Sequence, residues 1–391
     1  MPVPRTLAPA MLLLTLLTGG CSVATDESLG SPYPSYNVDP LAPDAQGMGD
    51  GAQAIASKIQ VGFNIGNTLE ATGGETAWGN PVITPAFVSF VKQTGFSALR
   101  LPVSWNDHAD PSTARIDATW LARVKDVVQY AVDAGLYVIV NAHWDGGWLE
   151  NHVTEADRTA VLAKQKAFWE QIATELRGFD DHVLFASANE PNVADAAQMK
   201  VLLAYHQAFI DAVRSTGGRN TYRTLVVQGP STDIEKTNQL MTGLPVDPTP
   251  GRLMVEVHDY SPWNFTGMTQ DESWGKQFYY WGKGNHSTTD PTHNPTWGEE
   301  EFIDTTLAMM KTQFVDRGIP VVIGEFGAQR RTNLTGDALQ LHLASRVSYF
   351  GHLSSQARAN GLLPFVWDTG SLLDRRNQTV LDPDVVAALL N

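Results

Sequence analysis

Hydrophobic and polar positions form alternating blocks along the chain from about residue 58 onward. Short runs rich in β-branched residues, such as 137–141, are followed by longer segments, such as 158–176, in which apolar residues recur at helical spacing. Several helical segments end at glycine, as at Ala134-Gly135 and Arg317-Gly318, and glycine is favoured just past a helix C-terminus. This alternation predicts βα units around a parallel sheet.

Eight of the short apolar runs are predicted to be strands, at residues 59–65, 98–102, 137–141, 183–188, 224–228, 253–258, 321–325 and 363–367. The clearest helices are predicted at residues 119–134, 158–176, 199–213, 305–316 and 338–359. A doubly wound open sheet would carry a Gly-x-Gly-x-x-Gly loop after its first strand, and Gly62-Phe-Asn-Ile-Gly66 does not match that pattern. Eight βα units instead predict an α/β fold of the (β/α)8 TIM barrel type, as a single domain over residues 50–391.

The N-terminal segment has the layout of a secretory signal over residues 1–20: a charge at Arg5, an apolar run at 11–17, and then small residues. The run is shorter than the ~20 residues that span a bilayer. The chain's only cysteine, Cys21, follows Gly19-Gly20, which resembles a bacterial lipoprotein processing site, although Thr18 stands where leucine is usual. We expect export, membrane attachment through a lipidated Cys21, and an extracellular or cell-surface location, including attachment to an outer membrane. Residues 21–49, rich in Ser, Pro, Asp and Gly, are predicted to be a flexible tether.

The net charge and the cysteine content argue against two kinds of protein, those that bind nucleic acid and those held together by disulfides. With 27 Lys and Arg against 42 Asp and Glu, the net charge is −15, which argues against nucleic acid as a partner. A single cysteine excludes an intramolecular disulfide framework. A monomer is expected.

Residues able to do chemistry recur at the predicted C-terminal ends of the strands. They are Asn64, Asn67, Arg100, Asn141, His143, Asn189, Glu190, His258, Tyr260, Glu325 and Trp367. In a TIM barrel these strand ends meet at one face, where active sites are built.

Two of these residues, Glu190 and Glu325, are carboxylates that end otherwise apolar strands. Such a pair is the minimum requirement for glycoside hydrolysis, in which one group gives a proton to the leaving oxygen and the other, ionised, attacks the anomeric carbon. Asn189 is suited to hydrogen-bond the sugar 2-OH. Arg100 and Tyr260 are expected to hold Glu325 ionised.

The ordered strand-end motifs resemble those of glycoside hydrolase family 5, the cellulase family. They are Gly62-Phe-Asn-Ile-Gly-Asn-Thr-Leu-Glu70-Ala71, Glu75-Thr-Ala-Trp78-Gly-Asn-Pro81, Arg100-Leu-Pro-Val-Ser-Trp105, Val138-Ile-Val-Asn-Ala-His143-Trp-Asp, Asn189-Glu190-Pro191, Val257-His258-Asp-Tyr260, Ile323-Gly-Glu325-Phe-Gly and Phe365-Val-Trp367-Asp-Thr-Gly370. The third-strand motif departs from the family at Trp144, which replaces a second histidine.

The resemblance implies a retaining endo-β-1,4-glucanase with no cofactor and no metal. It makes Glu190 the acid/base and Glu325 the nucleophile, and it places Trp367 under the sugar at the cleavage point. The other residues it assigns to substrate binding are Asn64, Asn67, Trp78, Arg100, His143, Asn189, His258 and Tyr260. The first-strand segment resembles the cellulase branches, so the expected substrate is a β-1,4-glucan, with mannan or xyloglucan as the alternative.

An insert of roughly 35 residues after strand six, long for a connection, contains Trp263, Trp274, Phe278, Tyr279, Tyr280, Trp281 and Trp297. Sugar rings stack their C–H faces on indoles, and long ordered loops beside a barrel mouth are usually functional. Trp281 or Trp263 is therefore predicted to be an outer sugar platform, with core packing as the competing interpretation.

The sequence offers two alternative classes of function, a metal-dependent hydrolase and a carbohydrate-binding protein without activity. Histidines and acids at His143-Trp144-Asp145, His258-Asp259, His286 and His293 could ligate a metal, but the His-rich pairings typical of metal hydrolases are absent from the sequence. A surface carbohydrate-binding protein without activity would be expected to lose Glu190 or Glu325, and both remain.

Overall fold

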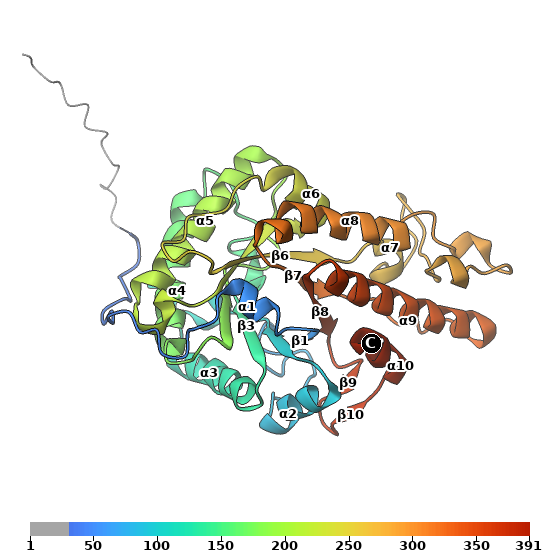
Figure 1. The fold of residues 1–391 in the computed structure, drawn as a ribbon, viewed down its shortest axis with the longest axis horizontal. Coiled ribbons are helices and arrows are strands. Elements are labelled where there is room, and N and C mark those ends of the chain that lie inside the picture. Colours follow the sequence, from blue (N-terminus) through green and yellow to red (C-terminus); the bar gives the residue numbers. More distant parts are fainter. Residues whose placement is uncertain (1–30) are drawn as a thin grey trace, which may run out of the picture. The chain divides into compact units, whose positions relative to one another are not determined.

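Eight parallel strands close into a barrel in the computed structural model, which describes residues 31–391. The predicted signal peptide at residues 1–20 and Cys21 lie outside the described residues. Each strand pairs with the next in sequence, and the last pairs with the first (Figure 1). The strands are β1 (Gly62–Ile65), β2 (Ala98–Leu101), β3 (Tyr137–Asn141), β4 (Val183–Ala186), β5 (Leu225–Asp233), β6 (Leu253–Asp259), β7 (Val321–Phe326) and β8 (Leu362–Asp368). The predicted (β/α)8 TIM barrel is confirmed.

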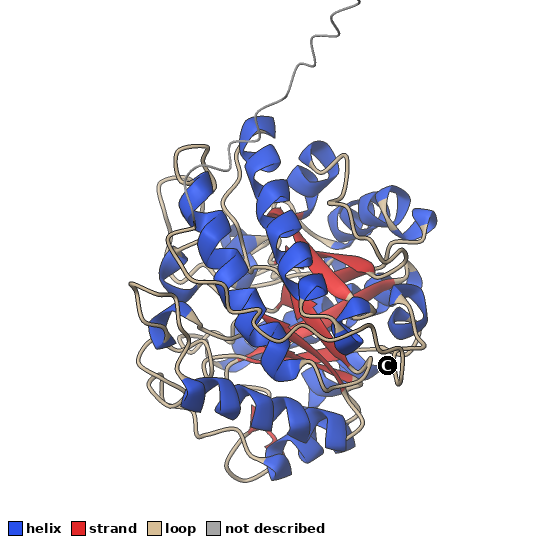
Figure 2. Ribbon diagram, turned by 90° about the vertical axis from the view of Figure 1, so that its left-hand side faces the viewer, coloured by secondary structure: helices blue, strands red, loops and turns tan. Residues whose placement is uncertain are grey.

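Helices surround these strands, as Figure 2 shows. They are α1 (Ala52–Ala56), α2 (Pro85–Thr94), α3 (Ala118–Asp133), α4 (Arg158–Leu176), α5 (Ala196–Ser215), α6 (Ile234–Leu240), α7 (Trp263–Thr266), α8 (Glu300–Gln313), α9 (Gly336–Ala359) and α10 (Pro383–Leu390). Local chemistry sets several of their starts: Asp117 and Asp195 accept hydrogen bonds from the first-turn N–H groups of α3 and α5. The small strands β9 (Leu373–Asp374) and β10 (Thr379–Val380) form a separate hairpin.

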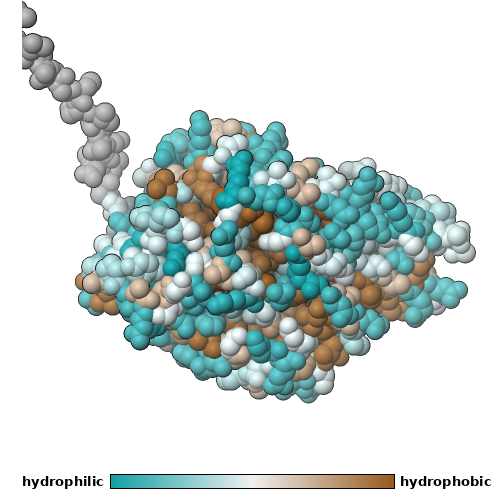
Figure 3. All heavy atoms as spheres, in the orientation of Figure 1, coloured by the Kyte–Doolittle hydropathy of each residue, from teal (hydrophilic) through white to brown (hydrophobic). Residues whose placement is uncertain are grey.

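Short 3₁₀ helices occupy several of the connections, at Asn106–His108, Asp145–Gly147, Gly218–Thr221, Lys283–Asn285, Pro291–His293 and Val315–Arg317. None of the helices within residues 31–391 is long and apolar enough to cross a bilayer. The face drawn in Figure 3 carries many hydrophilic residues, with hydrophobic ones gathered in patches between them.

Two hydrophobic clusters hold the barrel together. The larger one lies between the strands and the helices, and strand residues such as Leu99, Val255 and Ile323 belong to it. The smaller one includes the alternate residues of the same strands, such as Ala98, Met254 and Val322, and it also contains Ile55 and Ile59 from α1 and its C-terminal end. Alternation of period two along each strand therefore separates the barrel interior from its outer shell.

An irregularity in β7 changes this alternation next to a candidate residue. Val257 of β6 is in register with Ile323, but the next residue, His258, is in register with Glu325, so Gly324 is extra. A bulge of this kind re-aims the residues that follow it. Val322 faces the barrel interior. With strict alternation Glu325, three residues later, would point outward. The extra residue Gly324 instead brings the Glu325 side chain into the interior.

The segment before α1 is not the tether that was predicted for residues 21–49, at least over its described part. The buried Glu170 carboxylate of α4 accepts hydrogen bonds from the backbone N–H groups of Tyr36 (2.6 Å) and Asn37 (3.1 Å). Farther along, Arg252 donates to the carbonyl of Met48 at 2.8 Å, and Met48 is buried. The prediction is wrong for residues 32–49, because partners distant in sequence fix a segment that has no apolar periodicity of its own.

Candidate active site

A fully buried guanidinium, that of Arg100 in β2, ties the ends of several strands together. Its Nη1 donates to Asn64 Oδ1 (3.0 Å) and to Glu325 Oε1 (2.9 Å), and its Nη2 donates to Asn189 Oδ1 (2.7 Å). Arg100 therefore orients one residue from β1, one from β7 and one that follows β4. The planar fork of arginine suits it to this fixed arrangement.

The Glu325 carboxylate is surrounded by groups that stabilise its charged form. Besides the Arg100 contact, Oε2 accepts a hydrogen bond from the Tyr260 hydroxyl at 3.0 Å and lies 3.8 Å from His258 Nδ1. Burial and the neighbouring Glu190 charge raise the pKa of Glu325; His258, Arg100 and the Tyr260 hydroxyl oppose that rise but leave the pKa above its ordinary value. The arrangement expected from the sequence, with Arg100 and Tyr260 both on Glu325, is present.

Glu190 follows β4 and lies at the opening of the site, where 44% of its side chain is exposed. Its Oε1 is 2.7 Å from His258 Nδ1, and its backbone N–H donates to Glu150 Oε1 at 2.6 Å. Burial raises the pKa of Glu190, but the His258 contact and the Arg100 charge together outweigh burial, so the pKa lies below its ordinary value. One oxygen of Glu190 and one of Glu325 lie within 4.8 Å of each other. The two carboxylates thus face a common space.

His143 and Trp367 form one wall of the site. Their rings are parallel, with an interplanar angle of 7° and centroids 5.8 Å apart. A Cβ at position 66 would lie 2.7 Å from the Trp367 indole, so Gly66 makes room for that ring. Burial, together with the charges of Arg100 and His258, lowers the pKa of His143 well below its ordinary value. His143 is therefore neutral at pH 7.

The remaining predicted residues lie in loops around this site or in the core. Asn67 follows β1 with a φ of 58°, and its backbone N–H is bonded to the Glu70 carboxylate. Trp78 is half exposed in the loop between β1 and α2. Their contact with substrate stays a prediction.

Trp281 was predicted wrongly as an outer sugar platform. Its side chain is fully buried, its Nε1 donates to the Gly298 carbonyl at 2.8 Å, and its ring packs edge-on against Tyr349. The competing interpretation, core packing, is correct at this position. Other aromatic residues of the insert remain available, since Trp263, Trp274 and Trp297 are each about half exposed or more.

Glu150 and Glu256 are buried carboxylates outside the predicted set, and they contact residues of the site. Glu150 accepts the backbone N–H of Glu190, and Glu256 lies under His258 and Arg100. Glu256 could have been found, because it lies two residues before His258 in β6 and period two places both on the interior face.

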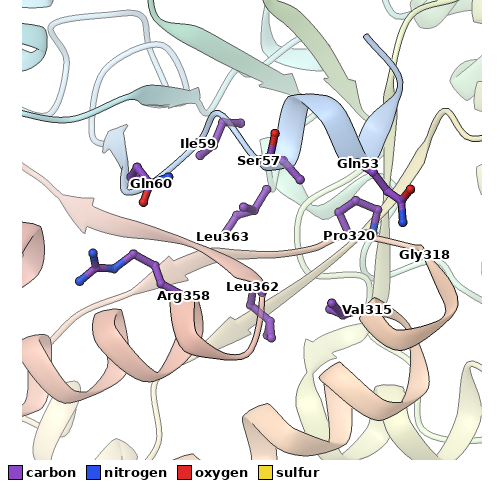
Figure 4. A pocket seen from close by; sticks show the side chains of 12 residues that line it. Gln53, Ser57, Ile59, Gln60, Val315, Gly318, Pro320, Arg358, Leu362 and Leu363 are labelled. Atoms are coloured by element: carbon purple, nitrogen blue, oxygen red, sulfur yellow. The ribbon is translucent and has the colours of Figure 1, made fainter.

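Three cavities of the barrel have room for a ligand. One of about 240 Å³ adjoins Glu190 and His258 and reaches Trp263 and Trp297. A second, of about 480 Å³, also borders Trp297 and continues past it. A third, of about 310 Å³, lies where α1 meets the N-terminal ends of β7 and β8, and Figure 4 shows Pro320 and Leu363 at its wall. No predicted catalytic residue lines that third cavity, so it is not the place of reaction.

Two clusters among the described residues bring three metal-ligating side chains together. One is Glu190, His258 and Glu325 itself. The Arg100 guanidinium already neutralises charge there, 2.9 Å from Glu325, which disfavours a second cation. The other is Asp180, Asp181 and His182, in which His182 already pairs with Asp180 at 3.0 Å and stacks on Tyr137.

Comparison with known proteins decides the family of this barrel. The model of the cellulase family, glycosyl hydrolase family 5, matches residues 62–372. The chain belongs to glycoside hydrolase family 5. The match begins in β1 and extends past β8, so it covers every strand that carries a site residue.

Curated relatives of the chain include several endoglucanases. A xyloglucan-specific endo-β-1,4-glucanase of Bacteroides ovatus is 37% identical over 382 residues, covering 91% of this chain and 73% of the relative. Endoglucanase A of Paenibacillus barcinonensis is 33% identical, covering 87% and 89%. This family 5 protein is accordingly a glycoside hydrolase of the endo-β-1,4-glucanase type, as its sequence predicts.

Solved structures agree with this assignment. The Bacteroides ovatus family 5 xyloglucanase in complex with a heptasaccharide superposes with a TM-score of 0.85 at 35% identity, covering 91% of this chain and 79% of that one. A broad-specificity endoglucanase from Ruminococcus champanellensis with bound cellotriose gives 0.75 at 30% identity, covering 88% and 99%. Both neighbours bind β-glucan oligosaccharides.

Proposed function

We propose that this family 5 glucanase cleaves its substrate with retention of configuration, with Glu325 as nucleophile and Glu190 as acid/base. The observation that carries the proposal is the spacing of the two carboxylates, whose oxygens come within 4.8 Å. Retaining glycosidases hold the two groups about 5–5.5 Å apart, whereas inverting ones leave about 6.5–9.5 Å for a water molecule.

In the first step Glu325 attacks the anomeric carbon while Glu190 protonates the leaving oxygen, and a glycosyl-enzyme ester forms. In the second step Glu190 takes a proton from water, which attacks the same carbon and releases Glu325. Arg100 and Tyr260 are placed to stabilise the Glu325 carboxylate that leaves in this step. Asn189, held by Arg100, is proposed to hydrogen-bond the 2-OH.

For the substrate, we propose a β-1,4-glucan backbone, with xyloglucan first and unbranched or mixed-linkage glucan second. The sequence alone favoured the reverse order. Similarity to xyloglucan-specific enzymes of the family, at 35 to 39% identity, supports placing xyloglucan first. The two adjoining cavities that run from Glu190 past Trp297 supply a path for a polymer beyond the cleavage point.

A substrate panel tests this choice. Purified enzyme is incubated with tamarind xyloglucan, barley β-glucan, carboxymethylcellulose and galactomannan, and released reducing ends are measured. The Glu190→Gln/Glu325→Gln protein is the control. We expect the fastest hydrolysis on xyloglucan, measurable hydrolysis on barley β-glucan, and none above control on galactomannan. Faster hydrolysis of galactomannan than of either glucan would contradict the proposal.

We further propose that the protein is exported as a monomer and anchored to a membrane through a lipid on Cys21. Support for export and for the lipid anchor comes from the N-terminal sequence alone. Cells expressing the chain are given a radioactive fatty acid, and the label should be lost in Cys21→Ala. Equal labelling of both proteins would rule out lipidation at this residue.

A further inference from the structure

A fully buried carboxylate, Glu256 of β6, lies inside the barrel beneath the proposed catalytic pair. Its Oε1 is 2.8 Å from Arg100 Nε and 3.2 Å from His258 Nε2. Its Oε2 accepts a hydrogen bond from Gln228 Nε2 at 2.6 Å. The Glu256 side chain has no exposed surface. The proposed reaction does not use Glu256 directly, because the residue is separated from the substrate space by His258.

The fold makes room for this carboxylate. A Cβ at position 324 would collide with Glu256 Oε1. Gly324 is also the extra residue that turns Glu325 inward, so the same glycine serves both carboxylates. A buried anion is tolerated only when it is paired and hydrogen-bonded, and here Arg100, His258 and Gln228 meet that requirement.

Glu256 determines which nitrogen of His258 carries a proton. An ionised carboxylate only accepts hydrogen bonds, and the Arg100 guanidinium beside Glu256 keeps its pKa low against the effect of burial, which raises it. Nε2 of His258 therefore carries a hydrogen in both the neutral and the charged ring. The other nitrogen, Nδ1, faces Glu190 Oε1 at 2.7 Å. A proton shared by these two atoms is bonded either to Glu190 Oε1, which makes the carboxyl group neutral, or to His258 Nδ1, which makes the imidazole ring charged.

The groups around His258 favour the protonated, positively charged form of its ring. Three carboxylates face the ring: Glu190, which follows β4, Glu325 of β7 and Glu256 of β6. Arg100 of β2 and the neutral His143, which follows β3, lie on its other sides. Burial lowers the pKa of His258, but the three carboxylates outweigh it and raise the pKa to about 10.

We propose that Glu256 is a positioning residue that fixes a proton on His258 Nε2, so that His258 Nδ1 and Glu190 hold one further proton as a pair and supply it to the leaving group. This inference rests on the proposed role of Glu190. When the glycosidic bond breaks and the Glu325–carbon bond forms, the pair gives up its proton to the leaving oxygen. When water then attacks, the pair regains a proton from that water as the Glu325–carbon bond breaks.

Removal of the Glu256 charge should lower the pKa of the Glu190–His258 pair. A neighbouring anion stabilises protonated forms, so replacing it with a neutral amide weakens the hold of the pair on its proton. The pair then loses its proton at lower pH. Since an unprotonated pair cannot assist departure of a poor leaving group, activity on such substrates should fall at lower pH than in the wild type.

The first experiment measures kcat/KM against pH for wild type and Glu256→Gln on a cellooligosaccharide, whose leaving group needs a proton. On the alkaline side of this pH profile, the fall in kcat/KM should occur at least about one pH unit lower in the variant than in the wild type. On 2,4-dinitrophenyl cellobioside, which needs little proton donation, kcat/KM at neutral pH should stay within about threefold. Glu170→Gln, which removes a buried carboxylate of α4 far from the site, should leave this fall at the same pH as in the wild type. A fall at the wild-type pH in a Glu256→Gln protein that still cleaves the dinitrophenyl substrate would overturn the proposal.

The second experiment needs no hydrolysis and measures the wild-type protein. Wild-type protein labelled with ¹⁵N-histidine is titrated by NMR, with His258→Gln used to assign the signals. We expect both His258 nitrogens to carry hydrogen at pH 8, and Nε2 to keep its hydrogen as the ring is deprotonated. Titration near the ordinary histidine value of about 6.5, or loss of the Nε2 hydrogen, would overturn the inference. If the chain proves to cleave no glucan, the proposed function fails while this result still stands on its own.

Discussion

The two halves of the barrel interior differ completely in chemistry, although the same strands build both. In the half nearer the N-terminal ends of the strands, the interior side chains are apolar, as with Ala98 of β2 and Met254 of β6. Two residues farther along these two strands, the interior positions hold Arg100 and Glu256. In β2 and β6, period-two alternation thus changes the interior side chain from an apolar one to a charged one within two residues.

This difference explains how a cluster of buried charges is tolerated. Desolvating an ion costs several kcal/mol, even after relaxation. The apolar half supplies hydrophobic burial that contributes to stability, and α1 extends it through Ile55. In the polar half each carboxylate has a cationic neighbour, as Arg100 contacts both Glu256 and Glu325. We therefore expect substitutions in the polar half to change catalysis and those in the apolar half to change stability.

The largest effect is expected from the proposed nucleophile. Glu325→Ala should lower kcat/KM by at least about 10⁴-fold on every substrate, since no ester can form. Glu190→Ala should cost about 10²–10⁴-fold on unactivated glucans but much less on 2,4-dinitrophenyl cellobioside, which needs little protonation. Kinetics of both variants on both substrates check this difference. Equal losses on the dinitrophenyl substrate would show that the two roles are assigned wrongly.

In the apolar half, Met254→Ala should lower the free energy of unfolding by about 2–5 kcal/mol, because Met254 is fully buried among interior side chains and its loss leaves a cavity. Denaturant unfolding measures this change. The kcat/KM of the folded fraction should remain within about twofold of wild type. A large catalytic loss with unchanged stability would break the division between the two halves.

Trp367→Ala should have a smaller catalytic effect than Glu325→Ala and a smaller effect on stability than Met254→Ala. The Trp367 indole is only partly buried, beside His143. We expect kcat/KM to fall by at least about 10-fold, which corresponds to about 1.4 kcal/mol of lost sugar stacking. The melting temperature should change little. Unchanged kinetics with a lowered melting temperature would instead make Trp367 a core residue.

The smallest effect is expected from salt. The chain carries a net charge of −15, but a neutral glucan offers nothing for long-range attraction to act on. KM for xyloglucan should change by less than about twofold between about 0.05 and 0.5 M NaCl. A steep dependence would indicate that charge, and not aromatic contact, governs binding.

The sequence predicted the strands and the strand-end residues well, because apolar runs and their polar ends are local signals. Three features escaped it for physical reasons. Gly324 looks like an ordinary glycine until its register with β6 is known. The burial of Trp281 depends on Tyr349, which is distant in the chain. Residues 32–49 are held by Glu170 and other side chains far along the sequence.

The central claim is that Glu325 forms a covalent bond to the sugar in the polar half of the barrel. The most direct measurement incubates the enzyme with 2,4-dinitrophenyl 2-deoxy-2-fluoro-β-cellobioside, which slows the second step, and identifies the modified peptide by mass spectrometry. We predict one sugar adduct per chain, located on Glu325. An adduct on Glu190 or on another residue would contradict the account, as would an absence of adduct together with release of the α anomer from natural substrate.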